Sequence, residues 1–162
     1  MTQQTPDLET TLRVTKTIAA PRDLVFKAWT EPERLKQWWG VEANFSAPIA
    51  EVDLRVGGKY RLGMLAPGES APYVVGGVFQ EVRPPEKLVY TWKWEHSDGS
   101  VPDSMLGSQE TLVTVEFLDK GGSTEVVVTH ENHPDRHSRD EHSKGWNGCL
   151  TQLTTLLERP GS

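Results

Sequence analysis

The sequence predicts an α+β fold: a curved antiparallel sheet of about seven strands wrapped around one long C-terminal helix, with two short helices between the first and second strands. Three observations predict this fold. The C-terminal end carries a long amphipathic stretch, the middle of the chain consists of strand-length segments separated by turn residues, and two short stretches of helical spacing lie near the start. Because the strand connections are hairpin-length, neighbouring strands should be antiparallel.

The first elements are a strand and two short helices. Apolar and polar residues alternate over 11–18, which is typical of a half-buried strand. Pro21 is expected as the first residue of a helix that runs to about Trp29, since proline is favoured at that position. Thr30 with Glu33 has the spacing of a capping box and predicts the start of the second helix.

The middle of the chain is typical of an antiparallel meander. A two-residue Gly57-Gly58 turn is expected to join the first two of its strands, because glycine tolerates positive φ. Pro84-Pro85 is expected as a stiff turn, and the polar stretch 96–109 as a long loop. The predicted strands cover residues 49–56, 59–65, 73–83, 87–95, 111–118 and 124–130.

The last stretch, Ser138–Glu158, organises the rest of the fold. Its apolar residues recur at intervals of three and four and form one stripe of a helix, and Pro160 prevents continuation. Ser138 with Glu141 predicts a capping box at its start. The stripe consists of Trp146, Cys149, Leu150, Leu153, Leu156 and Leu157.

A curved sheet diverges from a straight helix at one end, and a cavity remains where large side chains do not meet. Such a cavity would suit a flat, largely apolar ligand, with Trp38 near its mouth. The residues expected to bind this ligand are Trp38, Tyr60, Met64, Glu81, Tyr90, Trp92, His130, Trp146 and Leu150.

Several blocks of the sequence, in order, resemble the family named after the activator of the heat-shock-protein-90 ATPase, within the START-like (SRPBCC, birch-pollen-allergen-like) superfamily. The resemblance covers roughly residues 12–157 and implies the helix-grip fold. The blocks are Ala20–Arg22, Val25–Phe26, Ala28–Glu33, Gln37–Gly40, Asp53–Tyr60, Glu81–Trp92, Thr114–Phe117, Thr129–Glu131 and Gly145–Trp146.

The resemblance leaves three classes of function open, because this superfamily contains carriers, enzymes and a chaperone-activating domain. The first expectation is a protein that binds a small apolar or aromatic molecule. The second is a cyclase or lyase that uses the same pocket, and the third is a chaperone-activator-like interaction domain. Few residues precede the first strand, whereas the chaperone activator has a separate amino-terminal domain, and this weighs against the third.

Two residues suggest acid/base chemistry, although no catalytic motif identifies a catalytic residue. His130 shares a strand face with core valines and either lines the pocket or is a hydrogen-bonded core histidine. Glu81 points inward if Phe79 is in the core, and could then pair with His130. A shift of one residue in register would instead turn Glu81 outward.

Other chemistry finds little support. The spacing of the histidines predicts no metal site, and His133, His137 and His142 are interpreted as surface residues around a helix start. Cys149 lies among leucines in the helical stripe, which indicates a buried, inert thiol. No cofactor motif is present.

Composition sets the remaining expectations. The chain has 162 residues and a net charge of -6, which argues against nucleic-acid and anionic-membrane partners. A single cysteine allows no intrachain disulfide. Residues 1–9 are polar and are expected to be a disordered tail on one domain over 10–159. A cytoplasmic monomer or homodimer is expected.

Overall fold

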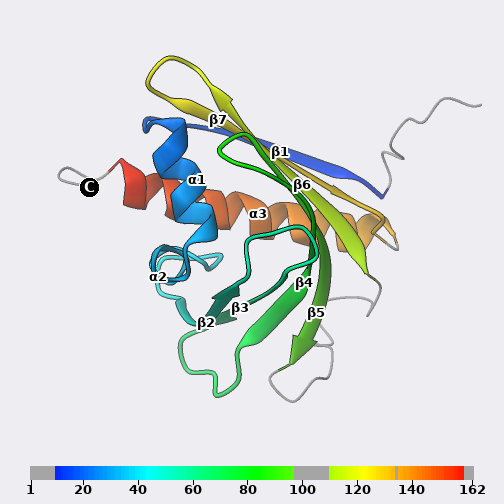
Figure 1. Ribbon diagram of the computed structural model, residues 1–162. Helices are drawn as coiled ribbons and strands as arrows, with labels where there is room; N and C mark the ends of the chain where they lie inside the picture. The colour runs from blue at the N-terminus through cyan, green and yellow to red at the C-terminus, as the bar shows by residue number, and fades with distance from the viewer. Residues whose placement is uncertain (1–9, 97–109, 134, 159–162) are drawn as a thin grey trace, which may run out of the picture.

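In the computed structural model, a seven-stranded antiparallel sheet bends around a long C-terminal helix, as predicted (Figure 1). The structure describes residues 10–96, 110–133 and 135–158. The predicted tail and residues 97–109 of the predicted loop lie outside these ranges. The strand order is β1-β7-β6-β5-β4-β3-β2, so six strands form a meander and the first strand adds beside the last. The elements are β1 (Leu12–Ile18), α1 (Arg22–Thr30), α2 (Pro32–Leu35), β2 (Ser46–Val52), β3 (Lys59–Leu65), β4 (Tyr73–Arg83), β5 (Lys87–His96), β6 (Thr111–Asp119), β7 (Thr124–Glu131) and α3 (Arg136–Leu157).

The short helices differ from the prediction at their ends. Pro21 precedes α1 with an extended backbone, so the helix begins one residue later than expected. The predicted capping box at Thr30 is wrong, because its hydroxyl donates to the carbonyl oxygen of Phe26 one turn earlier. Thr30 therefore belongs to α1, and α2 begins after Glu31 without a side-chain cap.

The β2–β3 hairpin has a longer connection than the predicted two-glycine turn. β2 ends at Val52, which pairs with Tyr60, and the chain between them forms a loop. The backbone N–H of Gly58 donates to the carbonyl oxygen of Arg55, and Gly57 has φ of 86°. The predicted strand over 49–56 is therefore placed too late in the sequence: β2 begins and ends earlier.

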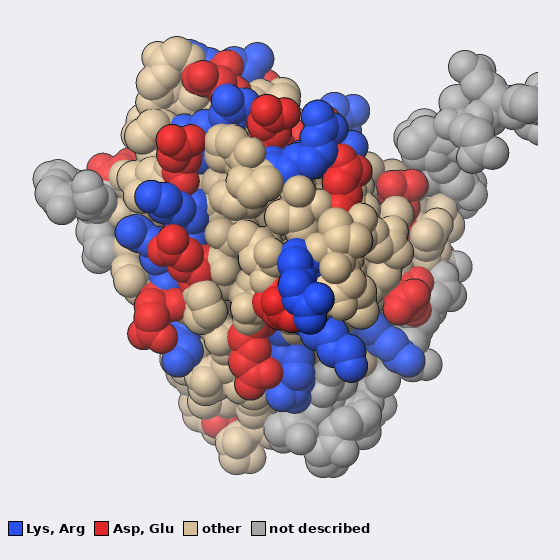
Figure 2. Space-filling view, viewed as in Figure 1, with Lys and Arg blue, Asp and Glu red and all other residues tan. Residues whose placement is uncertain are grey.

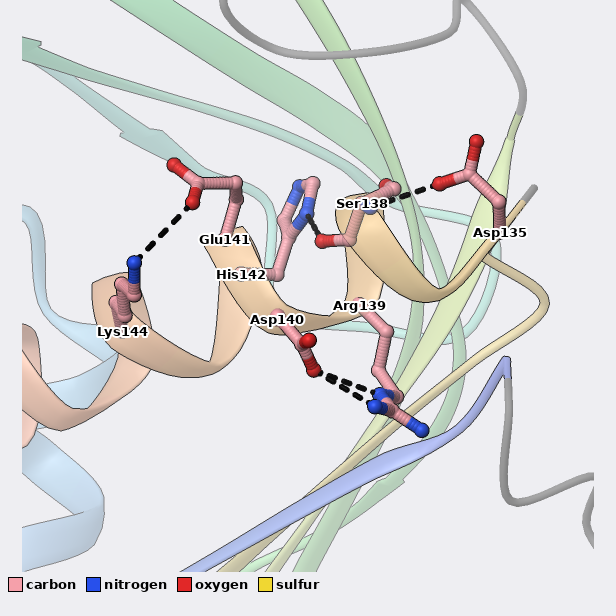
Figure 3. Close-up of polar contacts among 7 residues, drawn as sticks. All are labelled: Asp135, Ser138, Arg139, Asp140, Glu141, His142 and Lys144. Carbon is pink, nitrogen blue, oxygen red and sulfur yellow. Dashed lines mark hydrogen bonds and ion pairs between the residues drawn. The ribbon is translucent and has the colours of Figure 1, made fainter.

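The long helix begins earlier than predicted because a different residue caps it. The carboxylate of Asp135 accepts the backbone N–H of Ser138 at 2.8 Å (Figure 3). Glu141 pairs with Lys144 at 3.4 Å instead of reaching back to the helix start. The predicted Ser138–Glu141 capping box is therefore wrong, although the helix itself is confirmed.

The core lies between the concave face of the sheet and α3. In β6, buried and half-buried residues alternate, and Val113, Val115 and Phe117 point inward. The helix contributes Trp146 and Leu153 from its apolar stripe, both buried. Outside this core, basic and acidic side chains are interspersed over the face in Figure 2. None of the helices in the described ranges has the length and apolar character needed to cross a membrane.

Close approach between α3 and the segment before β2 predicts opposite effects for two glycine substitutions. A Cβ on Gly148 would overlap the backbone carbonyl of Val41, so Gly148→Ala should lower the free energy of unfolding by about 1–3 kcal/mol. A Cβ on Gly145 meets only the Val41 Cγ1 atom at 3.7 Å. Gly145→Ala should therefore gain helix propensity of up to about 1 kcal/mol. Urea unfolding of both variants measures the difference, and equal effects would contradict the close approach.

Candidate functional site

The candidate site is a small cavity between α3 and strands β3 and β5, called here the Trp92 cavity. Its volume is about 40 Å³, and it is partly open. Its walls are almost entirely apolar, while the exposed side chain of Glu141 lies at its edge. The lining residues are Trp39, Val41, Met64, Trp92, Trp94, Glu141, His142, Gly145, Trp146 and Cys149.

Aromatic rings fill most of the space under the bend of the sheet. Trp92 contacts Trp146 with 5.1 Å between ring centroids and Trp39 with 6.0 Å. Trp146 also stacks on Trp29 at 6.0 Å and an interplanar angle of 13°. Because large aromatic rings occupy most of the space between α3 and the curved sheet, only a small cavity remains there.

Three buried histidines lie together beside these aromatic rings, and one of them, His142, also lines the cavity. We call His130, His133 and His142 the histidine cluster, since their ring centroids lie 4.2, 4.7 and 5.2 Å apart. Their exposed fractions are 0%, 2% and 8%. The interpretation of His133 and His142 as surface residues is therefore wrong, whereas His137 is exposed.

Hydrogen bonds fix His130 in a neutral form. Its Nδ1 atom accepts the indole N–H of Trp146 at 3.1 Å. Its Nε2 atom lies 2.7 Å from the hydroxyl of Thr111, which itself donates to the carbonyl oxygen of Trp92. The hydroxyl hydrogen is thus used, so Nε2–H is the donor. His130 is therefore a core histidine with both nitrogens bonded.

His142 is neutral for the same kind of reason. Its Nδ1–H donates to the carbonyl oxygen of Ser138 at 2.8 Å, one helical turn earlier (Figure 3). Its Nε2 atom accepts the indole N–H of Trp94 at 2.7 Å. A second proton would place two N–H groups face to face, so the contact with Trp94 requires the neutral ring.

His133 is less completely bonded than its two neighbours. Its Nδ1 atom lies 3.3 Å from the hydroxyl of Ser138, while its buried Nε2 atom has no hydrogen-bond partner among the described residues. Burial lowers the pKa of His133 to about 4, with the nearby His142 adding to the effect. The pKa of His130 is lowered well below its ordinary value, and that of His142 is also lowered, in both cases mainly by burial.

The arrangement of the cluster does not make it a metal site. Three histidines lie together, but both nitrogens of His130 and His142 are occupied by hydrogen bonds. Only Nε2 of His133 is free, and one imidazole nitrogen is too few for a structural or catalytic zinc. Within the described ranges, no group of His, Cys, Asp or Glu side chains could hold a metal ion.

Three of the nine residues expected at the pocket line the Trp92 cavity: Met64, Trp92 and Trp146. Tyr60 and Tyr90 line a separate void of about 20 Å³ within the core. The hydroxyl of Tyr60 donates to the carbonyl oxygen of Thr91, and that of Tyr90 accepts from Trp29. The two tyrosine hydroxyls therefore form hydrogen bonds inside the core and do not line the Trp92 cavity.

The other expected residues lie elsewhere. Trp38 borders a polar surface hollow beside α3, and its indole N–H donates to the carbonyl oxygen of Ala28. Leu150 is 1% exposed and belongs to the core cluster, and His130 lies behind Trp92 and Trp146. None of these three lines the Trp92 cavity.

The proposed pairing of Glu81 with His130 is wrong. The register of β4 shifts between Phe79 and Glu81, so Phe79 lies opposite Tyr90 while Glu81 lies opposite Val89. Phe79 is buried, and the Glu81 side chain is 37% exposed. Its carboxylate pairs with Arg83 at 3.3 Å and with Lys87 at 3.7 Å. Glu81 is thus a surface residue at the end of β4.

The structure adds lining residues that the sequence interpretation did not assign to the pocket. Trp94 alternates with Trp92 along β5, and His142 lies one helical turn before Trp146, so both share a face with a predicted residue. These periodicities could have identified them. Trp39 directly follows Trp38, which was expected near the mouth, and no local pattern shows which of the two lines the cavity.

A curved antiparallel sheet closed on a C-terminal helix, with an apolar cavity between them, defines a helix-grip protein of the START-like superfamily. The family model described as Activator of Hsp90 ATPase homolog 1-like protein matches residues 19–158. The chain belongs to this family.

Solved structures of similar proteins agree with this assignment. A protein from Nitrosomonas europaea is 27% identical to this chain with a TM-score of 0.74, and the alignment covers 96% of this chain and 98% of that protein's chain. A protein from Chromobacterium violaceum is 25% identical with a TM-score of 0.76, covering 93% and 99%. The AHSA1 protein from Silicibacter pomeroyi is 25% identical with a TM-score of 0.75, covering 91% and 96%. No curated protein matches the chain.

Proposed function

We propose that the protein binds a small, largely apolar molecule in the Trp92 cavity. The observation that carries this proposal is the cavity itself: a partly open, apolar space between helix and sheet, with four tryptophans in its wall. Ligand sites of proteins are concave and mainly apolar, with few polar groups. Membership of a family with the helix-grip fold supports the same location.

The size of the cavity limits the ligand. A volume of about 40 Å³ has room for a few water-sized groups, each needing roughly 10–15 Å³. An aromatic ring would need more space, since a cavity of about 150 Å³ is known to hold benzene. The ligand therefore inserts one end between the tryptophans, while the remainder lies at the open side beside Glu141.

The cyclase or lyase alternative has little support from the cavity wall. His142 is the only described histidine in the wall, and both of its nitrogens are bonded. Burial raises the pKa of the Cys149 thiol to about 12, which leaves no thiolate near neutral pH. We propose a binding protein without a cofactor, and the expected cytoplasmic location and monomeric or homodimeric state belong to the same proposal.

Chaperone activation is a second candidate because the family description names the Hsp90 ATPase. Stimulation of ATP hydrolysis by purified Hsp90 on adding this protein would support it. Unchanged hydrolysis with no complex in size-exclusion chromatography would dispose of it.

The binding proposal is tested by titrating the ¹⁵N-labelled protein with toluene and cyclohexanone and following the six indole N–H signals. Trp39, Trp92, Trp94 and Trp146 line the cavity, so their signals should shift. Trp29 and Trp38 do not line it, and their signals should shift less. The single Trp→Phe variants assign the signals.

A filling variant provides the matched control for this titration. Gly145→Leu places a side chain at the cavity, whereas Asn147→Leu adds the same side chain at an exposed position of α3 outside the wall. Binding should be lost in the first variant and kept in the second. Shifts that are absent in the wild type, or equal in both variants, would refute the proposal.

A further inference from the structure

Most of the aromatic wall of the Trp92 cavity is held in place by its neighbours. The indole N–H groups of Trp94 and Trp146 donate to the buried histidines His142 and His130. The ring of Trp92 packs against Trp146 with 5.1 Å between centroids, and the next tryptophan of the wall packs against Trp146 at 6.0 Å. Because interiors are close-packed, none of these rings can move without losing such contacts.

Met64 differs from the rest of the wall. Its side chain lies on the inward face of β3, is 3% exposed and lines the cavity. Among the described residues of the wall, it is the only one with a long, flexible and apolar side chain. A methionine side chain has three rotatable bonds, and its thioether adapts to irregular spaces. Met64 can therefore change its conformation where the rings cannot.

The backbone beside Met64 is irregular as well. The register of β2 shifts between Ser46 and Ile49, so two residues of β2 lie opposite Met64 alone. One of the two is Pro48, which has no N–H to donate to the ladder. The pair of Met64 with Tyr73 is the last between β3 and β4. Irregularities of this β-bulge type are frequent beside functional sites, where they redirect a side chain.

We infer that Met64 is the specificity-determining residue of this cavity, and that its side chain moves aside when the ligand inserts an uncharged aromatic ring of phenyl size. This inference rests on the proposed binding function and names the group that is inserted. With Met64 in its present position, the volume of about 40 Å³ holds only a few water-sized groups. Moving the thioether adds the space that it now fills, and its sulfur can then contact the edge of the ring favourably.

The remainder of the wall suits an uncharged aromatic ring. Tryptophan faces and edges pack well against another ring. Among the described residues of the wall, Glu141 is the only charged one, and it is exposed at the edge. His142 is held neutral by its bonds to Trp94 and Ser138. A charged group would therefore be buried without a partner, which is costly, whereas a hydrocarbon ring has no such cost.

The first test follows the methyl group of Met64 while toluene is added. The chain has three methionines, and Met64→Leu shows which signal of methyl-¹³C-methionine-labelled protein belongs to Met64. Its carbon shift depends on the side-chain rotamer and should change together with the indole signals of the wall. An unchanged Met64 signal, with toluene shifting those indole signals, would overturn this inference and leave the binding function intact.

Met64→Ala and Leu62→Ala form a matched pair for the second test. Both shorten an inward side chain of β3, but Leu62 lines the separate void and not the Trp92 cavity. Naphthalene is one ring larger than toluene. Its affinity relative to toluene should rise at least about 10-fold in Met64→Ala, the lower end of size discrimination by an apolar pocket. Leu62→Ala should keep the wild-type ratio.

The outcomes of the second test separate the two proposals. The same naphthalene-to-toluene ratio in Met64→Ala and in the wild type would overturn the role of Met64. Toluene that does not bind the wild type would also overturn it, and the binding function falls as well only if cyclohexanone fails to bind. The wild-type methyl signal decides the matter if Met64→Ala does not fold.

Discussion

Trp146→Ala should lower the free energy of unfolding by about 3–5 kcal/mol, the range measured for removing large buried aromatic side chains. The indole is 3% exposed, stacks on Trp29 and contacts Trp92, so its loss leaves a void at the centre of the aromatic wall. It also leaves Nδ1 of His130 without its donor. Urea unfolding followed by circular dichroism measures the change.

Trp146→Phe separates the contribution of ring packing from that of the hydrogen bond to His130. It keeps a ring in the space and removes the N–H that His130 accepts, so the loss should be smaller, about 1–3 kcal/mol. Leu156→Ala is a second control in α3, since this side chain is only partly buried at the edge of the core. A loss below about 1 kcal/mol for Trp146→Ala would mean that the ring does not hold the helix to the sheet.

Lowering the pH from 7.5 to 5.5 should destabilise the protein by about 2–4 kcal/mol. The pKa values of His130, His133 and His142 are all lowered by burial in the fold, while the unfolded chain has the ordinary value of 6.5. Between these values the unfolded state binds more protons, so stability rises with pH there and is complete above about pH 7. Each histidine that stays neutral in the fold contributes about 1.4 kcal/mol over this interval.

Two single variants assign this pH dependence to the cluster. His142→Gln removes one titrating ring and should flatten the dependence of unfolding free energy on pH. His137→Gln, which removes an exposed ring outside the cluster, is the matched control variant. Equal slopes in the wild type and His142→Gln would show that this residue titrates alike in the folded and unfolded states.

The fold could be predicted from the sequence because its main elements are periodic. The alternation along β5 placed Tyr90, Trp92 and Trp94 on one buried face, and the stripe of α3 placed Trp146 and Leu153 inward. The ends of elements could not be predicted as well, because neighbouring residues compete for the same backbone groups.

The start of α3 illustrates this competition. Asp135 and Ser138 are both good capping residues, and the structure uses the carboxylate of Asp135 on the N–H of Ser138. The Ser138 hydroxyl instead lies beside His133. Which residue caps the helix thus depends on a partner that no local spacing reveals.

Only the residues of the candidate site that lie in periodic elements could be predicted from the sequence. Trp92 and Trp146 followed from periodicity, whereas the irregular register of β4 turned Glu81 outward, and such a bulge leaves no clear signal in the sequence. The burial of His133 depends on packing against His130 and His142, and its backbone N–H donates to Thr10 at the far end of the chain. Contacts between residues so far apart in the sequence form only when the whole domain folds, so local sequence patterns do not predict them.

The position of β1 at the edge beside β7 has a consequence for how the molecule is made. Thr124 donates to the carbonyl oxygen of Ala20 across 104 positions of sequence, and Glu158 accepts the backbone N–H of Ala19 across 139. β1 therefore has no sheet partner until β7, more than 100 residues later, has been synthesised. Closing such long loops late makes assembly slow compared with that of a helical bundle of equal size.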